Sequence, residues 1–311
     1  MRKGSLSSLL LGLAALGSCT AAPPVAESAN AADTPVPAQK PAPPAPAPEP
    51  APEPDPGYTL ANFYLMQQPV QGGIVLARAP SGTKRVLFNG RELPMAKDGF
   101  FLMAFDRDAE NSASLVAEKR SGPAFTEYLK VAPGNWRIEH VNAAMTGGAK
   151  TTAEFEARRG PELARINAAR AQQNDSDGWR QQFIWPVKGR LSGLFGAQRI
   201  YRGTPGSYHS GMDIAVPTGT PFVAPADGVV TLAAQDAFTL EGHLLMIDHG
   251  MGLNSAFLHC SELLVKEGDR VKQGQVIGKV GATGRASGPH LHWGMKWNAA
   301  RTDPKLLVPA G

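Results

Sequence analysis

The chain has 311 residues, a formal net charge of +4, 42% hydrophobic residues and 19% charged residues. This length allows about two domains, and the composition excludes a membrane protein with many spanning helices. A nucleic-acid-binding protein is also excluded, because no dense run of Lys and Arg provides a basic surface.

The N-terminus has the pattern of an export signal. Met1-Arg2-Lys3 is positively charged, and the apolar run Leu9–Leu16 that follows is too short to span a bilayer. It leads into Leu16-Gly17-Ser18-Cys19, which resembles a bacterial lipobox. We therefore expect a signal peptide over residues 1–18 and a lipid anchor on Cys19. The alternative is an ordinary signal peptide that is cleaved near Ala21-Ala22.

Residues 19–57 are predicted to be a tether. From Pro23 to Pro56 the chain is almost entirely Pro, Ala and Glu, a composition that cannot form a core and favours extended polyproline II. At ~3.1 Å per residue, this stretch reaches on the order of 100 Å. Because Thr20 rather than Asp follows Cys19, the resemblance to a bacterial lipobox implies an outer-membrane lipoprotein that faces the periplasm.

Residues 58–150 are predicted to form a small β-sandwich, because turn signals recur about every ten residues between short apolar runs. Gly72-Gly73 precedes one such run, and Asp98-Gly99 precedes another. This part of the chain contains no catalytic constellation.

Residues 151–182 are predicted to be a helical connector. Thr151-Thr152-Ala153-Glu154 fits a capping box, and Pro161-Glu162 fits the start of a second helical piece. Because its apolar residues are sparse and its charged residues many, we expect a solvated connecting helix rather than a core helix.

Residues 183–311 are predicted to form a second β domain, since β-branched runs and Gly or Pro junctions return. The predicted strands cover residues 187–195, 221–230, 243–248, 253–259 and 275–280, and the last strand begins at His290.

Six of the seven histidines lie in this last part of the chain, and four belong to two short motifs. His209 and Asp213 form an H-x-x-x-D motif on a loop that enters a strand. His290 and His292 form an H-x-H motif, and alternation along a strand places both on one face. Two imidazoles and one carboxylate are a ligand set of catalytic zinc, which keeps a fourth position open for water. His259, at the end of an apolar run, and whichever member of the H-x-H pair does not bind the metal are then free to move protons.

The order of these motifs resembles the lysostaphin-type (LytM-type) zinc metallopeptidases over residues 183–307. The matching segments are 209–215, 219–221, 224–230, 247–250 and 281–292. The resemblance implies an antiparallel, barrel-sandwich-hybrid-like fold and one Zn²⁺ held by His209, Asp213 and His292. It implies catalytic roles for His259 and His290, and hydrolysis of bacterial peptidoglycan peptide crosslinks by a metal-activated water.

The sequence departs from the family pattern at Phe257, where Tyr is usual, and at Cys260, where Leu is usual. Both side chains are apolar, so we expect altered packing and retained activity. A metal or nucleophile role for Cys260 is the alternative to burial, and we expect burial because it adjoins His259 in a strand. His243 is expected at the surface near the groove, and His249 is expected to be structural.

Two other functions fit parts of the sequence. A family member without hydrolytic activity activates or regulates a partner cell-wall amidase, although such proteins lose ligands and this chain keeps all five residues. A biotinyl or lipoyl carrier is indicated weakly by the turn at Gly268–Gln275, but Lys296 lies on the H-x-H strand and not at a hairpin tip. The predicted partners are thus peptidoglycan, the membrane through Cys19, and a protein regulator of unknown identity.

Overall fold

The computed structural model describes residues 58–144 and 152–309. The predicted signal peptide, Cys19 and the predicted tether lie outside these residues. None of the helices in the described ranges is long and apolar enough to cross a membrane.

The first part of the described chain consists of two four-stranded antiparallel sheets that share a core. One sheet has the order β1-β2-β3-β6 and the other the order β5-β4-β7-β8. The strands are β1 (Tyr58–Thr59), β2 (Tyr64–Leu65), β3 (Ile74–Arg78), β4 (Thr83–Phe88), β5 (Arg91–Leu93), β6 (Phe100–Ala104), β7 (Ser112–Lys119) and β8 (Phe125–Lys130). Val75 and Phe101 of the first sheet belong to the same buried cluster as Val86 and Leu115 of the second. The mainly β fold class is confirmed.

The C-terminal part is built on an eight-stranded antiparallel sheet of order β10-β13-β21-β17-β16-β15-β19, with β22 paired to β21. A three-stranded sheet, β14-β20-β18, lies in the same part of the chain, and no sheet among the described residues closes into a barrel. The elements are β10 (Arg190–Gly193), β13 (Met212–Ala215), β14 (Pro221–Val223), β15 (Gly228–Phe238), β16 (Gly242–Asp248), β17 (Leu253–Cys260), β18 (Glu262–Leu263), β19 (Arg270–Val271), β20 (Val276–Lys279), β21 (Leu291–Trp297), β22 (Ala300–Thr302) and the 3₁₀ helices η1 (Gly178–Arg180) and η2 (Pro304–Leu306).

The two faces of the large sheet have different surroundings. Alternate residues of β21 are buried, and Trp293 stacks on Phe257, which in turn packs against Phe222 of the small sheet. The intervening residues of β21 are only partly buried. One face of the large sheet therefore forms the core, and the other is left for a helix and a groove.

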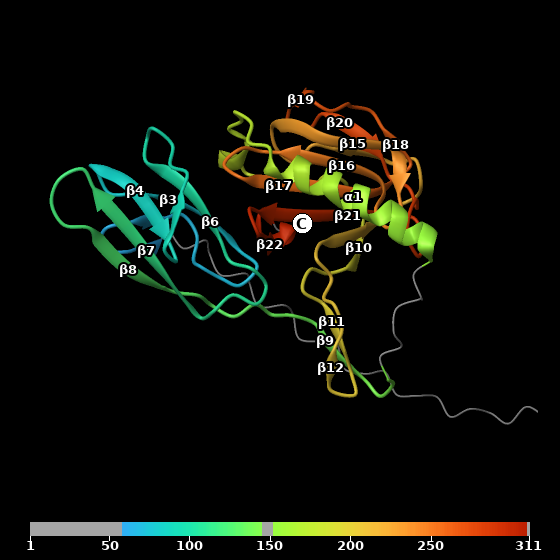
Figure 1. Ribbon diagram of the computed structural model, residues 1–311, viewed down its shortest axis with the longest axis horizontal. Helices are drawn as coiled ribbons and strands as arrows, with labels where there is room; N and C mark the ends of the chain where they lie inside the picture. Colours follow the sequence, from blue (N-terminus) through green and yellow to red (C-terminus); the bar gives the residue numbers. More distant parts are fainter. Residues whose placement is uncertain (1–57, 145–151, 310–311) are drawn as a thin grey trace, which may run out of the picture. The chain divides into compact units, whose positions relative to one another are not determined.

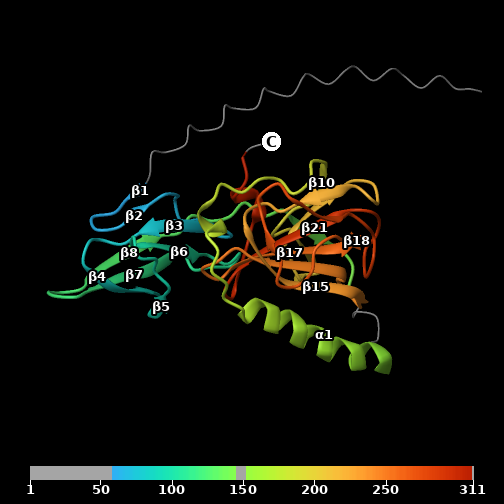
Figure 2. The ribbon, with the colours of Figure 1, turned by 90° about the horizontal axis from the view of Figure 1, so that it is seen from above.

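The helix α1 (Ala153–Ala171) packs on the less buried face of the large sheet (Figures 1 and 2). Ile166 and Ala169 are buried in a cluster with residues of β15 and β16. Most of α1 is exposed, as expected for a solvated connecting helix, but the prediction does not include this buried stripe, which packs on the sheet.

The ends of α1 also differ from the prediction. The N-cap is Thr152, whose hydroxyl accepts a hydrogen bond from the Phe155 amide at 3.1 Å. Pro161 lies inside one continuous helix and does not start a second one.

Two predicted strands in the C-terminal part need correction. The expected strand over residues 221–230 is two strands, β14 and β15, which belong to different sheets. A bend at Pro225-Ala226 separates them, because proline cannot donate a ladder hydrogen bond. The expected last strand begins at Leu291 and not at His290, and β22 follows it.

A fifth sheet, with three short strands, connects the two parts of the described chain. It contains β9 (Ile138–Val141), β11 (Gln198–Tyr201) and β12 (Thr204–Pro205), and β9 pairs with β11 in parallel. This sheet extends the loop that leads from β10 to His209, so it belongs to the surroundings of the candidate site.

Candidate metal centre

Register in the large sheet brings three of the predicted residues together. Asp213 on β13 pairs directly with His292 on β21, and His292 pairs with Leu258 on β17. His209 lies four residues before Asp213, on the loop that enters β13. Adjacent strands therefore place the carboxylate and one imidazole side by side, and the loop supplies the second imidazole.

The donor atoms of these residues form a compact triangle. Asp213 Oδ1 lies 3.2 Å from His209 Nε2 and 2.8 Å from His292 Nδ1, and the two histidine atoms are 3.2 Å apart. Tetrahedral zinc with bonds of about 2.0 Å needs donors about 3.3 Å apart. The set of His209, Asp213 and His292 therefore fits one zinc ion.

Backbone carbonyl groups fix the orientation of the histidine rings. His209 Nδ1 donates to the Leu194 carbonyl at 3.1 Å, because a carbonyl oxygen can only accept. This tautomer leaves Nε2 of His209 unprotonated and directed at Asp213. Such outer partners orient metal ligands and raise their basicity.

Small residues leave room for this arrangement. A Cβ atom on Gly193 would collide with the Asp213 carboxylate, and one on Gly211 would come within 2.5 Å of His292 Nε2. Both positions therefore require glycine for the donor set to form.

The charges around the donor set favour an ionised carboxylate. Burial raises the pKa of Asp213, but hydrogen bonds and charge from the imidazoles of His209 and His292 in their protonated forms, without a metal, outweigh burial and hold this pKa well below its usual range. Burial lowers the pKa of His292, with a partial opposing effect of Asp213. An ionised carboxylate and a neutral imidazole are the forms that bind a metal ion.

The two predicted proton carriers lie beside the donor set. The ring centres of His259 and His290 are 4.9 Å apart, and His290 Nε2 is 3.6 Å from Asp213 Oδ1. His259 Nδ1 donates to the Thr283 carbonyl at 2.8 Å, and His290 Nδ1 donates to the Gly288 carbonyl at 2.8 Å. Both rings therefore have an unprotonated Nε2, which can accept a proton.

A local distortion of β17 gives His259 its position. Leu258 already faces the groove, so regular alternation would turn His259 toward the core. The register of β16 and β17 shifts near this point, and His259 has a left-handed φ of 64°. A bulge of this kind redirects a side chain, and it is common next to active sites.

The remaining predicted residues lie away from the donor set. Cys260 is fully buried, and burial raises the pKa of its thiol to about 12. His249 is also buried, where its Nδ1 donates to the Asp227 carbonyl and its Nε2 contacts the Ser255 hydroxyl at 2.8 Å. His243 is half-buried, and its Nδ1 lies 3.1 Å from the Cys260 carbonyl.

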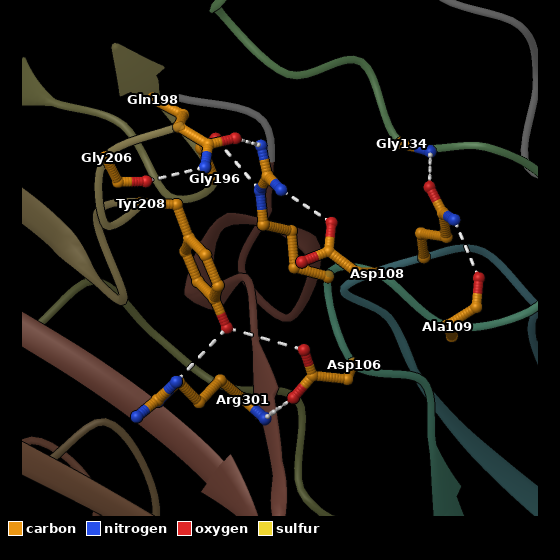
Figure 3. Close-up of polar contacts among 11 residues, drawn as sticks. Asp106, Asp108, Ala109, Gly134, Gly196, Gln198, Gly206, Tyr208 and Arg301 are labelled. Atoms are coloured by element: carbon orange, nitrogen blue, oxygen red, sulfur yellow. Dashed lines mark hydrogen bonds and ion pairs between the residues drawn. The ribbon is translucent and has the colours of Figure 1, made fainter. Parts of the chain in front are cut away.

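Residues from the first part of the chain hold the loop that carries His209. The hydroxyl of Tyr208 contacts Asp106 Oδ1 and Arg301 Nη1, each at 3.4 Å, and Asp106 Oδ2 accepts from the Arg301 amide at 2.9 Å (Figure 3). Arg107 is 5% exposed, and its guanidinium lies 4.8 Å from the centre of the Tyr208 ring. No sequence pattern marks Asp106 or Arg107, because their contacts are about 90 or more residues away in the chain.

Comparison with known proteins shows to which family the chain belongs. The model of peptidase family M23 matches residues 207–304. A crystal structure from Pseudomonas aeruginosa, described as that of a candidate peptidase M23, is 30% identical with a TM-score of 0.61, and the match covers 79% of this chain and 97% of that one. The chain belongs to peptidase family M23.

Curated relatives match only part of their own length. The peptidoglycan DD-endopeptidase ShyA of Vibrio cholerae is 35% identical over 159 residues, which are 49% of this chain and 36% of the relative. The cell division protein DipM of Caulobacter vibrioides is 36% identical over 134 residues, which are 41% of this chain and 21% of the relative. The chain therefore spans well under half the length of these curated relatives.

Proposed function

We propose that the protein is a zinc-dependent endopeptidase that hydrolyses peptide crosslinks of bacterial peptidoglycan. The observation that carries the proposal is the complete set of His209, Asp213 and His292 with His259 and His290 beside it, at the edge of an open groove. The relative named as a peptidoglycan DD-endopeptidase supports the choice of substrate. The predicted divisions at residues 58–150, 151–182 and 183–311 remain part of the proposal.

In this proposal His209, Asp213 and His292 hold the metal ion. Zinc, when bound there, acidifies a water molecule and polarises a carbonyl group. His259 is suited to accept the proton of the water, because burial lowers its pKa and its Nε2 is unprotonated. His290, with its ring beside that of His259, is suited to hydrogen-bond the carbonyl oxygen of the scissile peptide as negative charge develops, once its Nε2 has taken up a proton.

The test is digestion of purified sacculi by the zinc-loaded full chain, followed by mass spectrometry of the released muropeptides. We expect crosslinked products to decrease, and we expect Asp213→Ala to abolish both zinc content and hydrolysis. Unchanged crosslinks with the wild-type protein would refute the endopeptidase.

The same assay distinguishes the non-hydrolytic alternative from the endopeptidase. A regulator of a cell-wall amidase would leave sacculi intact alone and release denuded glycan only when the amidase is added. The complete donor set favours the endopeptidase, because a regulator has no need for a zinc ligand set.

The proposal also includes the cell envelope as the site of action. The lipobox-like segment before Cys19 and the following Pro-rich stretch fit a lipoprotein of the outer membrane that reaches peptidoglycan from its anchor.

A further inference from the structure

A row of side chains leads along the less buried face of the large sheet, away from the donor set. His292, Gly294 and Lys296 alternate with buried residues on β21 and therefore share this face. Their neighbours on β17 are Leu258, Ala256 and Asn254, in the same order. Lys296 lies four residue steps along the strand from His292, which is a distance of about 13 Å.

The surface along this row has free space at Gly294, in the middle of the row. A Cβ atom on Gly294 would meet only His292 Nε2 and the Ser210 carbonyl, both at 3.7 Å, so local packing does not require glycine there. A cavity of about 250 Å³ lies along the row. It shares Ser210, Glu241, Leu258 and His292 with the opening at the catalytic histidines, so the two hollows are adjacent.

Three cationic side chains line the far part of this cavity: Arg170 at the end of α1, Lys296 on β21 and Arg301 on β22. Within residues 58–144 and 152–309, none of the three forms an ion pair with an acidic side chain. Burial and then the charge of Arg301 lower the pKa of Arg170. Burial, followed by the charges of Arg170 and Arg301, lowers the pKa of Lys296.

The nearby acidic groups have other partners. Glu241 is bound by Arg159, with nitrogen–oxygen distances of 2.6 and 2.9 Å. Asp106 accepts from the amide of Arg301 and contacts Tyr208. Like charges that are partly removed from water repel each other, and this cost is offset where an anion binds among them.

Two residues of the cavity lining also have a buried polar atom without a hydrogen-bond partner among the described residues. These atoms are Nε of Arg170, a donor, and Oδ1 of Asn254, an acceptor. Neither atom is exposed to the cavity, so a ligand in the cavity would contact the three cationic side chains and not these two atoms.

We propose that this cavity is a subsite for a carboxylate of the peptide substrate, about 13 Å along the groove from the bond that is cut. The identity of the ligand rests on the proposed function, whereas the cationic cavity itself does not. Lys296 and the guanidinium groups of Arg170 and Arg301 donate to the carboxylate, and an extended peptide follows β21 between the two sites.

The test uses the zinc-loaded full chain and two synthetic stem tetrapeptides. One has free carboxylates and the other has the corresponding carboxamides. Isothermal titration calorimetry should show that the wild-type protein binds the acid peptide about 10-fold tighter or more, as expected for charge-assisted hydrogen bonds. In Lys296→Gln and in Arg170→Gln we expect this preference to fall below about 3-fold, with binding of the carboxamide peptide unchanged.

A matched control is Lys84→Gln, which removes the charge of an exposed lysine on β4 and should keep the full preference. Thermal unfolding shows whether a variant that loses the preference has also lost stability. Because the substitutions at Lys296 and Arg170 relieve repulsion, both variants should melt at the wild-type temperature or above it.

The subsite would be overturned by equal binding of both peptides by the wild-type protein, by an undiminished preference in both variants, or by a lower melting temperature in both variants. Displacement of the acid peptide by inorganic phosphate at a similar concentration would also overturn it, since the cavity would then take any small anion. Digestion of sacculi is scored separately, so a protein that prefers the acid peptide but cuts nothing would refute the proposed function alone.

Discussion

Two neighbouring histidines are assigned to catalysis, His259 to proton transfer and His290 to the carbonyl oxygen of the substrate, and neither to metal binding. Substituting His259 or His290 by Ala should therefore leave zinc content near one ion per chain. Hydrolysis should fall about 10²- to 10⁴-fold, the usual contribution of a general acid or base. Metal content is measured by plasma mass spectrometry, and hydrolysis by release of muropeptides.

The matched control for both variants is His140→Ala, which removes an exposed histidine on β9 and should change neither quantity. Loss of zinc in His259→Ala or His290→Ala would contradict the assignment, because it would make that residue a ligand.

Cys260 is expected to be chemically inert in the folded protein. Burial raises the pKa of its thiol to about 12, so the reactive thiolate is scarce at neutral pH, and the side chain is fully buried. In a Cys19→Ser background, a thiol reagent should modify Cys260 only after denaturation in urea. Rapid modification of the native protein at pH 8 would show instead that the thiol is accessible.

The residues of the candidate site could be found from the sequence, because spacing along a loop and a strand is itself a local property. His209 and Asp213, and likewise His290 and His292, are close in the chain. The backbone groups that hold these side chains in place could not be predicted from the sequence. The Leu194 and Thr283 carbonyls have no side-chain signature, and the left-handed bulge at His259 depends on the register with β16.

At the scale of elements, α1 is the part that the sequence described least well. Its helical nature follows from local propensity and capping, whereas its packing depends on the apolar side chains of the sheet, which are distant in the sequence. Ile166 is 4% exposed and meets residues of β15 and β16 that are more than sixty positions away. A stripe of two buried apolar residues is too sparse to distinguish a packed helix from a solvated one.

Substitution of Ile166 tests this packing. Ile166→Ala should lower the free energy of unfolding by about 2 kcal/mol or more, because it removes buried apolar volume and leaves a cavity. Chemical denaturation followed by circular dichroism gives the value.

Leu163→Ala provides the comparison within the same helix, since Leu163 is 41% exposed. This change should cost no more than about 0.5 kcal/mol. Equal losses in the two variants would mean that α1 does not depend on its buried face.

At the scale of the whole molecule, the catalytic and supporting parts are linked by specific contacts. Tyr208 precedes His209 and contacts Asp106 from the first part of the chain and Arg301 from β22. Burial raises the pKa of Tyr208, so its hydroxyl stays protonated and able to donate. The first part of the chain therefore supports the loop that carries a zinc ligand, in addition to any contact with substrate or a regulator.

The proposed anchor places the whole molecule in the cell envelope. The h-region ends in Gly17-Ser18-Cys19, and acylation of Cys19 would hold the protein to the membrane through more than one acyl chain. Wild-type protein should therefore sediment with outer-membrane vesicles and take up radiolabelled palmitate. Cys19→Ser should be recovered in the soluble fraction without label, while its zinc content and its hydrolysis of purified sacculi stay at the wild-type level. Cleavage near Ala21-Ala22 predicts the opposite for the wild-type protein: an unlabelled, soluble product whose N-terminus lies beyond Cys19.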